Sequence, residues 1–147
     1  MIRAGESDRG SAVLEFIALG VGVLVPLGYI VLAAAGVQSA VFASTQAVRE
    51  AARAYVSAGT TAEAQTRALG AARLAFDDHG LDLPAGALTV SCPGGPCLAP
   101  GAEVTVELDW RVPVPWLPAS LAGSAPGLVP VHVRHVVPVD EYRGSPV

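Results

Sequence analysis

The longest apolar stretch of this sequence contains a single charged residue. After Gly10 the next charge is Glu15, and after Glu15 none appears until Arg49. Residues 16–36 alone give 21 uncharged positions, which as a helix reach about 31 Å at a rise of 1.5 Å per residue. That length matches the roughly 30 Å hydrocarbon core of a bilayer. The stretch therefore predicts a membrane span over about residues 16–36.

Glu15 is the residue of this stretch that most needs an explanation. A carboxylate at the mouth of a membrane helix is costly to place in hydrocarbon, so it is a functional-site hypothesis by default. Three interpretations of the N-terminus compete. A secretory signal peptide, cut near Ala35, has a shorter apolar region of about 7 to 15 residues. A plain single-span anchor explains the length but does not need Glu15. A prepilin-type start, with Gly10 and Ser11 flanking the cut, accounts for the length and the charge together.

Helix breakers and small residues cluster inside the predicted span. Pro26 removes one backbone hydrogen bond and should bend the helix locally. Gly20, Gly22 and Gly28 lie around it, and small residues let neighbouring helices approach closely in a membrane. The alternative is that Gly and Pro are simply common in membrane helices. Both interpretations stay open at this point.

The next segments predict a helical hairpin outside the membrane. Polar residues follow the span on an Ala-rich background, so the first helix is expected over residues 11–57. Gly59 breaks it, and Thr60 with Glu63 forms a capping-box pattern. A second helix is expected within residues 60–79, ending at His79 and followed by a glycine. Its predicted apolar face consists of Ala64, Ala68, Leu69, Ala72, Ala75 and Phe76.

Beyond residue 87 the pattern changes to strands. Residues 103–112 alternate strictly, with Val104, Val106, Leu108, Trp110 and Val112 on one face. Shorter candidates cover residues 88–92 and 129–139, separated from the long strand by Pro-rich or Gly-rich connections. The expected fold class is α+β: a long N-terminal helix, a short second helix and an antiparallel sheet of about three strands. Residues 87–147 would form the β-rich part.

The two cysteines stand close together. Cys92 and Cys97 enclose the sequence Pro-Gly-Gly-Pro. Outside the cytoplasm a disulfide is the natural interpretation of this pair, although free thiols are also compatible with the sequence. A zinc site would need two further ligands, and no second cysteine pair or nearby histidine supplies them. We therefore expect no metal.

The sequence shows no pattern that indicates catalysis. His132 and His135 lie three apart on a predicted strand, so they point to opposite faces and cannot share a ligand. No phosphate-binding glycine motif, metal-binding helix motif or nucleophile with an adjacent base is present. A net charge of −4 without a basic block argues against a nucleic-acid interface. We expect no enzyme, no cofactor and no nucleic acid.

Three motifs together resemble the start of TadE-like proteins, the minor pseudopilins of tight-adherence (Flp-type) pili in the type IV class. They are RGSA at residues 9–12, the pair Glu15 and Phe16, and VREAARA at residues 48–54. The resemblance covers about a third of the chain. It implies that residues 1–10 are a leader, removed by a membrane prepilin peptidase that cuts between Gly10 and Ser11.

The resemblance also implies a role for Glu15 and a set of partners. Cleavage creates an ammonium group on Ser11, and Glu15 of the same or a neighbouring subunit would pair with it and fix the register of packed helices. The expected partners are the prepilin peptidase, other pilins or pseudopilins, the pilus-assembly machinery and membrane lipid. The expected location is a single-pass membrane protein with a cytoplasmic leader and an extracytoplasmic C-terminal domain, at the cell surface or in a pilus. The alternative is an uncleaved, membrane-anchored extracytoplasmic interaction module.

Overall fold

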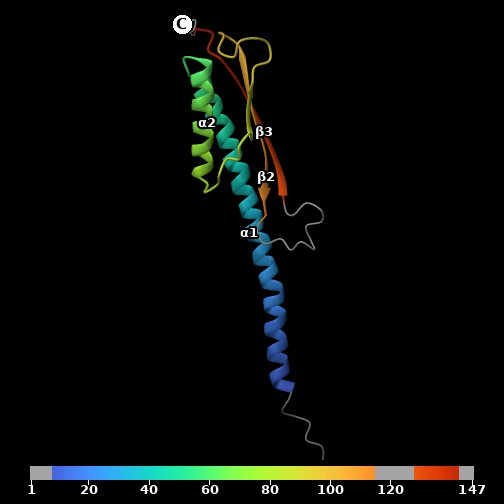
Figure 1. Ribbon diagram of the computed structural model, residues 1–147. Helices are drawn as coiled ribbons and strands as arrows, with labels where there is room; N and C mark the ends of the chain where they lie inside the picture. The colour runs from blue at the N-terminus through green and yellow to red at the C-terminus, as the bar shows by residue number, and fades with distance from the viewer. Residues whose placement is uncertain (1–7, 115–127, 143–147) are drawn as a thin grey trace, which may run out of the picture. The chain divides into compact units, whose positions relative to one another are not determined.

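The computed structural model describes residues 8–114 and 128–142. Its elements run in the order α1 (Asp8–Val56), α2 (Thr61–Asp77), β1 (Leu88–Ser91), β2 (Glu103–Pro113) and β3 (Leu128–Pro138) (Figure 1). The strands form one antiparallel sheet in the order β1-β2-β3. The protein is therefore an α+β protein with a long N-terminal apolar helix, a short second helix and a three-stranded sheet, as the sequence predicted.

The chain divides into two compact units, Met1–Gly36 and Val37–Val147. The boundary at Gly36 is the residue at which the predicted membrane span ends. Unit 1 contains the first part of α1. Unit 2 contains the rest of α1, all of α2 and the sheet.

In unit 2, α1 buries one face. The buried positions recur three and four residues apart, which is the helical period; they are Ala40, Ala43, Ser44, Ala47, Val48, Ala51, Ala52 and Tyr55. Alanine has the highest helix propensity and carries little bulk, so the same residues both form this helix and allow close packing against it. Arg49, Glu50 and Arg53 lie on the exposed side.

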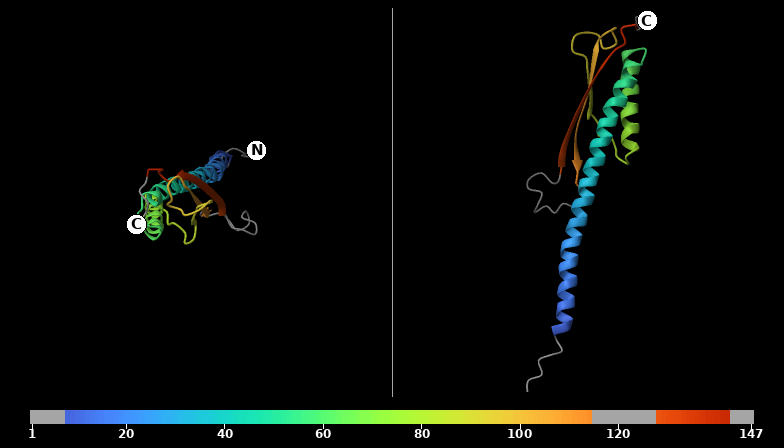
Figure 2. Two further views of the ribbon diagram at one scale, coloured as in Figure 1. Left: turned by 90° about the horizontal axis from the view of Figure 1, so that it is seen from above. Right: turned by 180° about the vertical axis from the view of Figure 1, so that it is seen from behind.

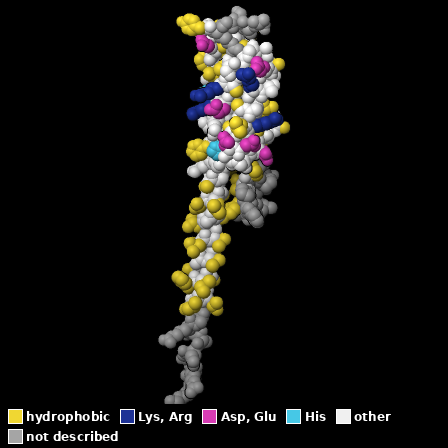
Figure 3. All heavy atoms as spheres, turned by 90° about the vertical axis from the view of Figure 1, so that its left-hand side faces the viewer, with side chains coloured by type: hydrophobic (Ala, Val, Ile, Leu, Met, Phe, Trp, Pro, Cys, Tyr) yellow, Lys and Arg dark blue, Asp and Glu magenta, His cyan; other side chains and the backbone are white. Residues whose placement is uncertain are grey.

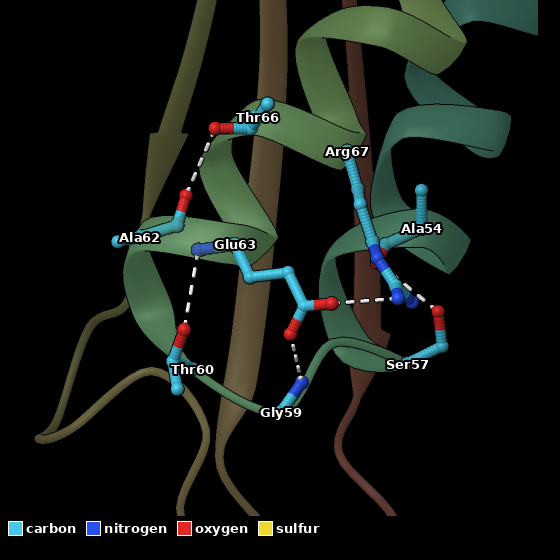
Figure 4. Close-up of polar contacts among 8 residues, drawn as sticks. All are labelled: Ala54, Ser57, Gly59, Thr60, Ala62, Glu63, Thr66 and Arg67. Atoms are coloured by element: carbon cyan, nitrogen blue, oxygen red, sulfur yellow. Dashed lines mark hydrogen bonds and ion pairs between the residues drawn. The ribbon is translucent and has the colours of Figure 1, made fainter.

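A capping box starts α2. The side-chain oxygen of Thr60 accepts a hydrogen bond from the Glu63 backbone N–H at 3.3 Å (Figure 4). The Glu63 carboxylate in turn accepts from the backbone N–H of Gly59 at 3.0 Å and pairs with Arg67 at 2.6 Å. The predicted cap is confirmed, with one difference: the carboxylate reaches Gly59, one residue before the N-cap. The bond from Glu63 to Thr60 satisfies an N–H that the first helical turn leaves without a partner.

The buried face of α2 is narrower than predicted. Ala64, Ala68, Ala72, Ala75 and Phe76 are buried as expected. Leu69 was predicted on this face but is 36% exposed. It lies at the margin of the helix–sheet contact, where it lines a groove beside β1.

The sheet has one apolar and one polar face. Along β2 the side chains of Val104, Val106, Leu108 and Val112 are buried, and Trp110 is half-buried, which confirms the predicted apolar face. Both helices cover this face, and the chain turns sharply between them (Figure 2). The opposite face carries polar and charged side chains from β2 and β3, among them Glu107 and Asp109 opposite Arg134 and His132. One layer of helices on one layer of sheet encloses the core.

Prolines in the strands occupy positions that need no ladder hydrogen bond. The Asp109 N–H bonds to Ala87 beyond the end of β1, and the Val139 N–H bonds to Ala102 beside β2. With the continuous register, the even-numbered residues of β3 direct their N–H groups away from β2. Pro130 and Pro138 are both even-numbered. They therefore cost the sheet no hydrogen bond, as expected for proline on an edge strand.

One buried polar contact joins α1 to the sheet. The indole N–H of Trp110 donates to Ser44 Oγ at 2.9 Å, and the Ser44 hydroxyl donates to the Ala40 carbonyl at 2.7 Å. The Trp110 ring meets Phe76 of α2 edge to face, with centroids 5.2 Å apart. Trp110 thus contacts both helices, and its one polar group is satisfied within the core.

Candidate functional site

The apolar part of α1 is exposed along its whole length. No residue from 12 to 36 is buried, and Phe16 and the Val, Leu and Ile side chains from Val13 to Leu32 are each exposed by half or more. Hydrophobic side chains cover this part of α1, whereas charged ones gather on unit 2 (Figure 3). Leaving one such side chain in water rather than burying it costs about 1.5–3 kcal/mol, so this surface requires a lipid or protein partner.

By length and composition α1 is able to cross a membrane. It is the one helix of the described part of the chain that is long and apolar enough, and none of its apolar window is buried inside the protein. A core helix of a soluble protein would be mostly buried. The structure therefore supports a single N-terminal span and leaves its orientation open.

The predicted processing residues all lie in α1. The helix begins at Asp8, so Gly10 and Ser11 are in its first turns, earlier than the expected start at residue 11. Glu15 is exposed, and Phe16 is 77% exposed. Glu15 is the one charged residue between Arg9 and Arg49. The helix thus presents one carboxylate beside an otherwise apolar surface, while the proposed cleavage stays a prediction.

The predicted packing glycines have open space around them in the part of the chain that the structure describes. A methyl group built on Gly20, Gly22 or Gly28 would meet nothing within 4 Å. Pro26 lies inside α1, which continues on both sides of it. The described residues of one subunit therefore do not require glycine at these positions, and their use in helix packing stays a prediction.

Cys92 and Cys97 form a disulfide, with their Cα atoms 5.2 Å apart. The loop between them passes through Gly94 and Gly95, whose φ angles of 113° and 149° are rarely adopted by residues with a side chain. Next to this loop and the turn at residues 59–61 is a largely apolar cavity of about 480 Å³, lined by Gly59, Thr60, Thr61, Pro96, Leu98, Ala99 and Pro100. Among these described residues, the polar side chains are the two threonine hydroxyls.

The histidines have three separate environments. His132 lies on the polar face of the sheet, 2.7 Å from Asp109, whereas His135 lies opposite Val106 on the other face; this confirms that the two point apart. His79 follows α2 and contacts two side chains of α1, with Ser39 Oγ at 3.3 Å and Gln46 Oε1 at 3.4 Å. Within the described residues, no three His, Cys, Asp or Glu side chains gather to hold a metal ion.

Sequence reasoning missed the contacts that join distant segments. Ser44 bonds to Trp110 across 66 residues, and Arg134 pairs with Glu107 at 3.4 Å across the sheet. The signal for the second pair was the alternation of charges on two strands, but it becomes usable only once the register is known. No signal in the sequence pairs Ser44 with Trp110.

In comparisons with known proteins, no family model, no curated protein and no solved structure matches the chain.

Proposed function

We propose that this protein is a minor pseudopilin, or pilus-assembly subunit, of a Tad-type pilus, processed by prepilin peptidase between Gly10 and Ser11. The observation that carries the proposal is Glu15, the one charge in an exposed helix of membrane length, five residues after the glycine. A structural anchor has no use for this carboxylate. A new ammonium group on Ser11 gives it a partner, and the pair fixes the axial register of packed helices.

The location follows from the same proposal. The leader lies in the cytoplasm, α1 crosses the membrane once, and unit 2 lies outside it. The Cys92–Cys97 disulfide supports this orientation, because disulfides persist in oxidising compartments outside the cytoplasm. Within the assembly the role is structural, with other pilins or pseudopilins and the assembly machinery as partners.

The second candidate is an uncleaved membrane-anchored interaction module. The observation that favours it is the start of α1 at Asp8, which places the Gly10–Ser11 bond inside the first turns of the helix. A peptidase would have to unwind that turn to reach the bond. An uncleaved module retains the disulfide and the span but leaves Glu15 without a role.

The deciding measurement is the intact mass of the protein purified from its native membrane. A mature chain that begins at Ser11 supports the pseudopilin, whereas one that begins at Met1 leaves the uncleaved module and rules out processing. A start near Gly36 would indicate a secreted domain.

A variant pair then tests the role of Glu15 in assembly. Glu15→Gln should keep insertion and cleavage but abolish incorporation into the pilus assembly, measured by co-purification with the other subunits. Glu50→Gln removes an exposed carboxylate of the same helix, outside the span, and should assemble normally. Equal assembly of both variants contradicts the proposed pairing.

A further inference from the structure

One end of unit 2 lies only a few residues along the chain from the predicted end of the membrane span. Val37 directly follows Gly36, where the span ends. Ala40 packs in a small core with Val112 of β2 and Val131 of β3, and Val37 and Val129 pack against the same core. At 1.5 Å per residue, Ala40 is about 6 Å along the helix from Gly36. The ends of β2 and β3 therefore lie within reach of the lipid headgroup layer.

Exposed apolar side chains persist at this end. On α1, Val41 is 41% and Phe42 is 66% exposed, and Phe42 is about 9 Å along the helix from Gly36. At the strand ends, Pro113 and Pro130 are exposed and Val114 is half-buried. We name the surface formed by these five residues the span-proximal end.

Charge is sparse at the adjoining strand ends, where Arg111, exposed and directly opposite Pro130, is the last charged residue of β2. No Asp, Glu, Lys or Arg stands between Arg111 and Arg134 in the sequence, although β2 and β3 carry charges elsewhere on their polar face. Headgroup layers take up roughly 5–8 Å on each side of the hydrocarbon core. Apolar side chains at that depth are stabilised by partial burial at the boundary with the acyl chains.

We propose that the span-proximal end of unit 2 rests in the headgroup layer of the bilayer that α1 crosses, as a second lipid contact. The inference rests on the membrane span in the proposed function, but not on processing or pilus assembly. The partner in this contact is the lipid surface itself.

Two acidic residues that follow α2 determine which lipid headgroups favour this contact. His79 contacts Ser39, and Leu81 packs on the core around Ala40, so Asp78 and Asp82 lie toward the same end. The two carboxylates outnumber the one cation at this end, Arg111, and carboxylates at a membrane surface are repelled by anionic headgroups. Zwitterionic lipids such as phosphatidylcholine therefore favour the contact, and anionic lipids weaken it.

A single spin label tests the proposal in the full-length chain. The two native cysteines are disulfide-bonded and there are no others, so an introduced cysteine is the one free thiol. We would label Phe42→Cys and Val114→Cys in phosphatidylcholine vesicles. The measurement compares collision rates with oxygen, which enters lipid, and with a nickel chelate, which stays in water. Leu24→Cys reports on the span, and Tyr142→Cys reports on a residue that is 94% exposed.

The expected result is an oxygen-to-nickel ratio several-fold above that of Tyr142→Cys at both test sites, and below that of Leu24→Cys. The ratio should fall when anionic lipid is added. Water-like ratios at both test sites, with Leu24→Cys in lipid, overturn the surface contact and leave the span intact. A water-like ratio at Leu24→Cys overturns the span and the proposed function with it. Low collision rates with both reagents, together with dipolar broadening, indicate a second protein copy and also overturn the lipid contact.

Discussion

Ser44 is the residue at which α1 and the sheet share a polar contact. It is fully buried, accepts from the Trp110 indole and donates to the Ala40 carbonyl. Removing its oxygen leaves the indole N–H without a partner in the core, and an unsatisfied buried donor costs about 1–3 kcal/mol. We expect Ser44→Ala to lower the free energy of unfolding by about that amount.

Denaturant unfolding followed by tryptophan fluorescence measures the change. Thr45→Ala is the matched control, because the exposed Thr45 hydroxyl also bonds to a carbonyl four residues earlier, that of Val41. Its loss exposes nothing unsatisfied, so stability should change little. Equal effects of the two substitutions would contradict the proposed role of Ser44.

Tyr55 makes the stability of unit 2 dependent on alkaline pH. Burial raises the pKa of the Tyr55 hydroxyl above its ordinary value of 10.0, because the charged form loses its hydration. The unfolded chain therefore ionises at lower pH than the folded chain. The stabilisation is fully present below about pH 10 and is lost as the pH rises through the folded pKa.

Unfolding free energies measured from about pH 8 to pH 11 should fall more steeply for the native chain than for Tyr55→Phe. Tyr142→Phe is the control, since Tyr142 is almost fully exposed. It should retain the native pH dependence. If Tyr55→Phe retains it as well, another group is responsible for the loss.

At the scale of the element, the positions of the prolines in β3 show which of its backbone N–H groups the sheet needs for hydrogen bonds. Its odd-numbered residues bond to β2, whereas Pro130 and Pro138 occupy even-numbered positions on the free edge. The two edges of one strand thus tolerate proline differently. The difference depends on which side each N–H points to, because proline lacks that donor.

A pair of valine substitutions tests this register. Val133→Pro removes an N–H directed at β2 opposite Leu108; the carbonyl left without its donor should cost about 1–3 kcal/mol. Val136→Pro removes an N–H on the free edge and should cost much less. Thermal unfolding monitored by circular dichroism compares the two. A larger loss for Val136→Pro would show that the edge assignment is wrong.

At the scale of the whole molecule, the two units have different requirements. Every residue of the two buried clusters lies in unit 2, whereas unit 1 buries none of its described side chains. We expect a chain that starts at Val37 to stay monomeric and folded without detergent. The full-length chain should aggregate unless detergent or lipid covers α1. Size-exclusion chromatography and circular dichroism measure both properties, and an unfolded truncated chain would show that unit 2 depends on unit 1.

Local patterns in the sequence were sufficient for the elements and for the residues of the candidate site. The charge-free run identified the helix that fits a membrane, alternation identified the buried face of β2, and Thr60 with Glu63 identified the start of α2. Each of these depends on residues within a few positions of one another, where helix and strand periods act directly. Glu15 was found in the same way, because it interrupts a pattern.

Only the tertiary structure decided which distant residues meet. Ser44 finds Trp110, Leu69 falls at the margin of the core, and Ala40 packs against the ends of β2 and β3, because long-range pairing sets these contacts. A periodic pattern specifies a face but not its neighbour, and the strand register depends on the packing of the whole sheet. The sequence by itself thus determined an apolar α1, a short capped α2 and three strands. The fold decided which side chains of unit 2 meet in its core.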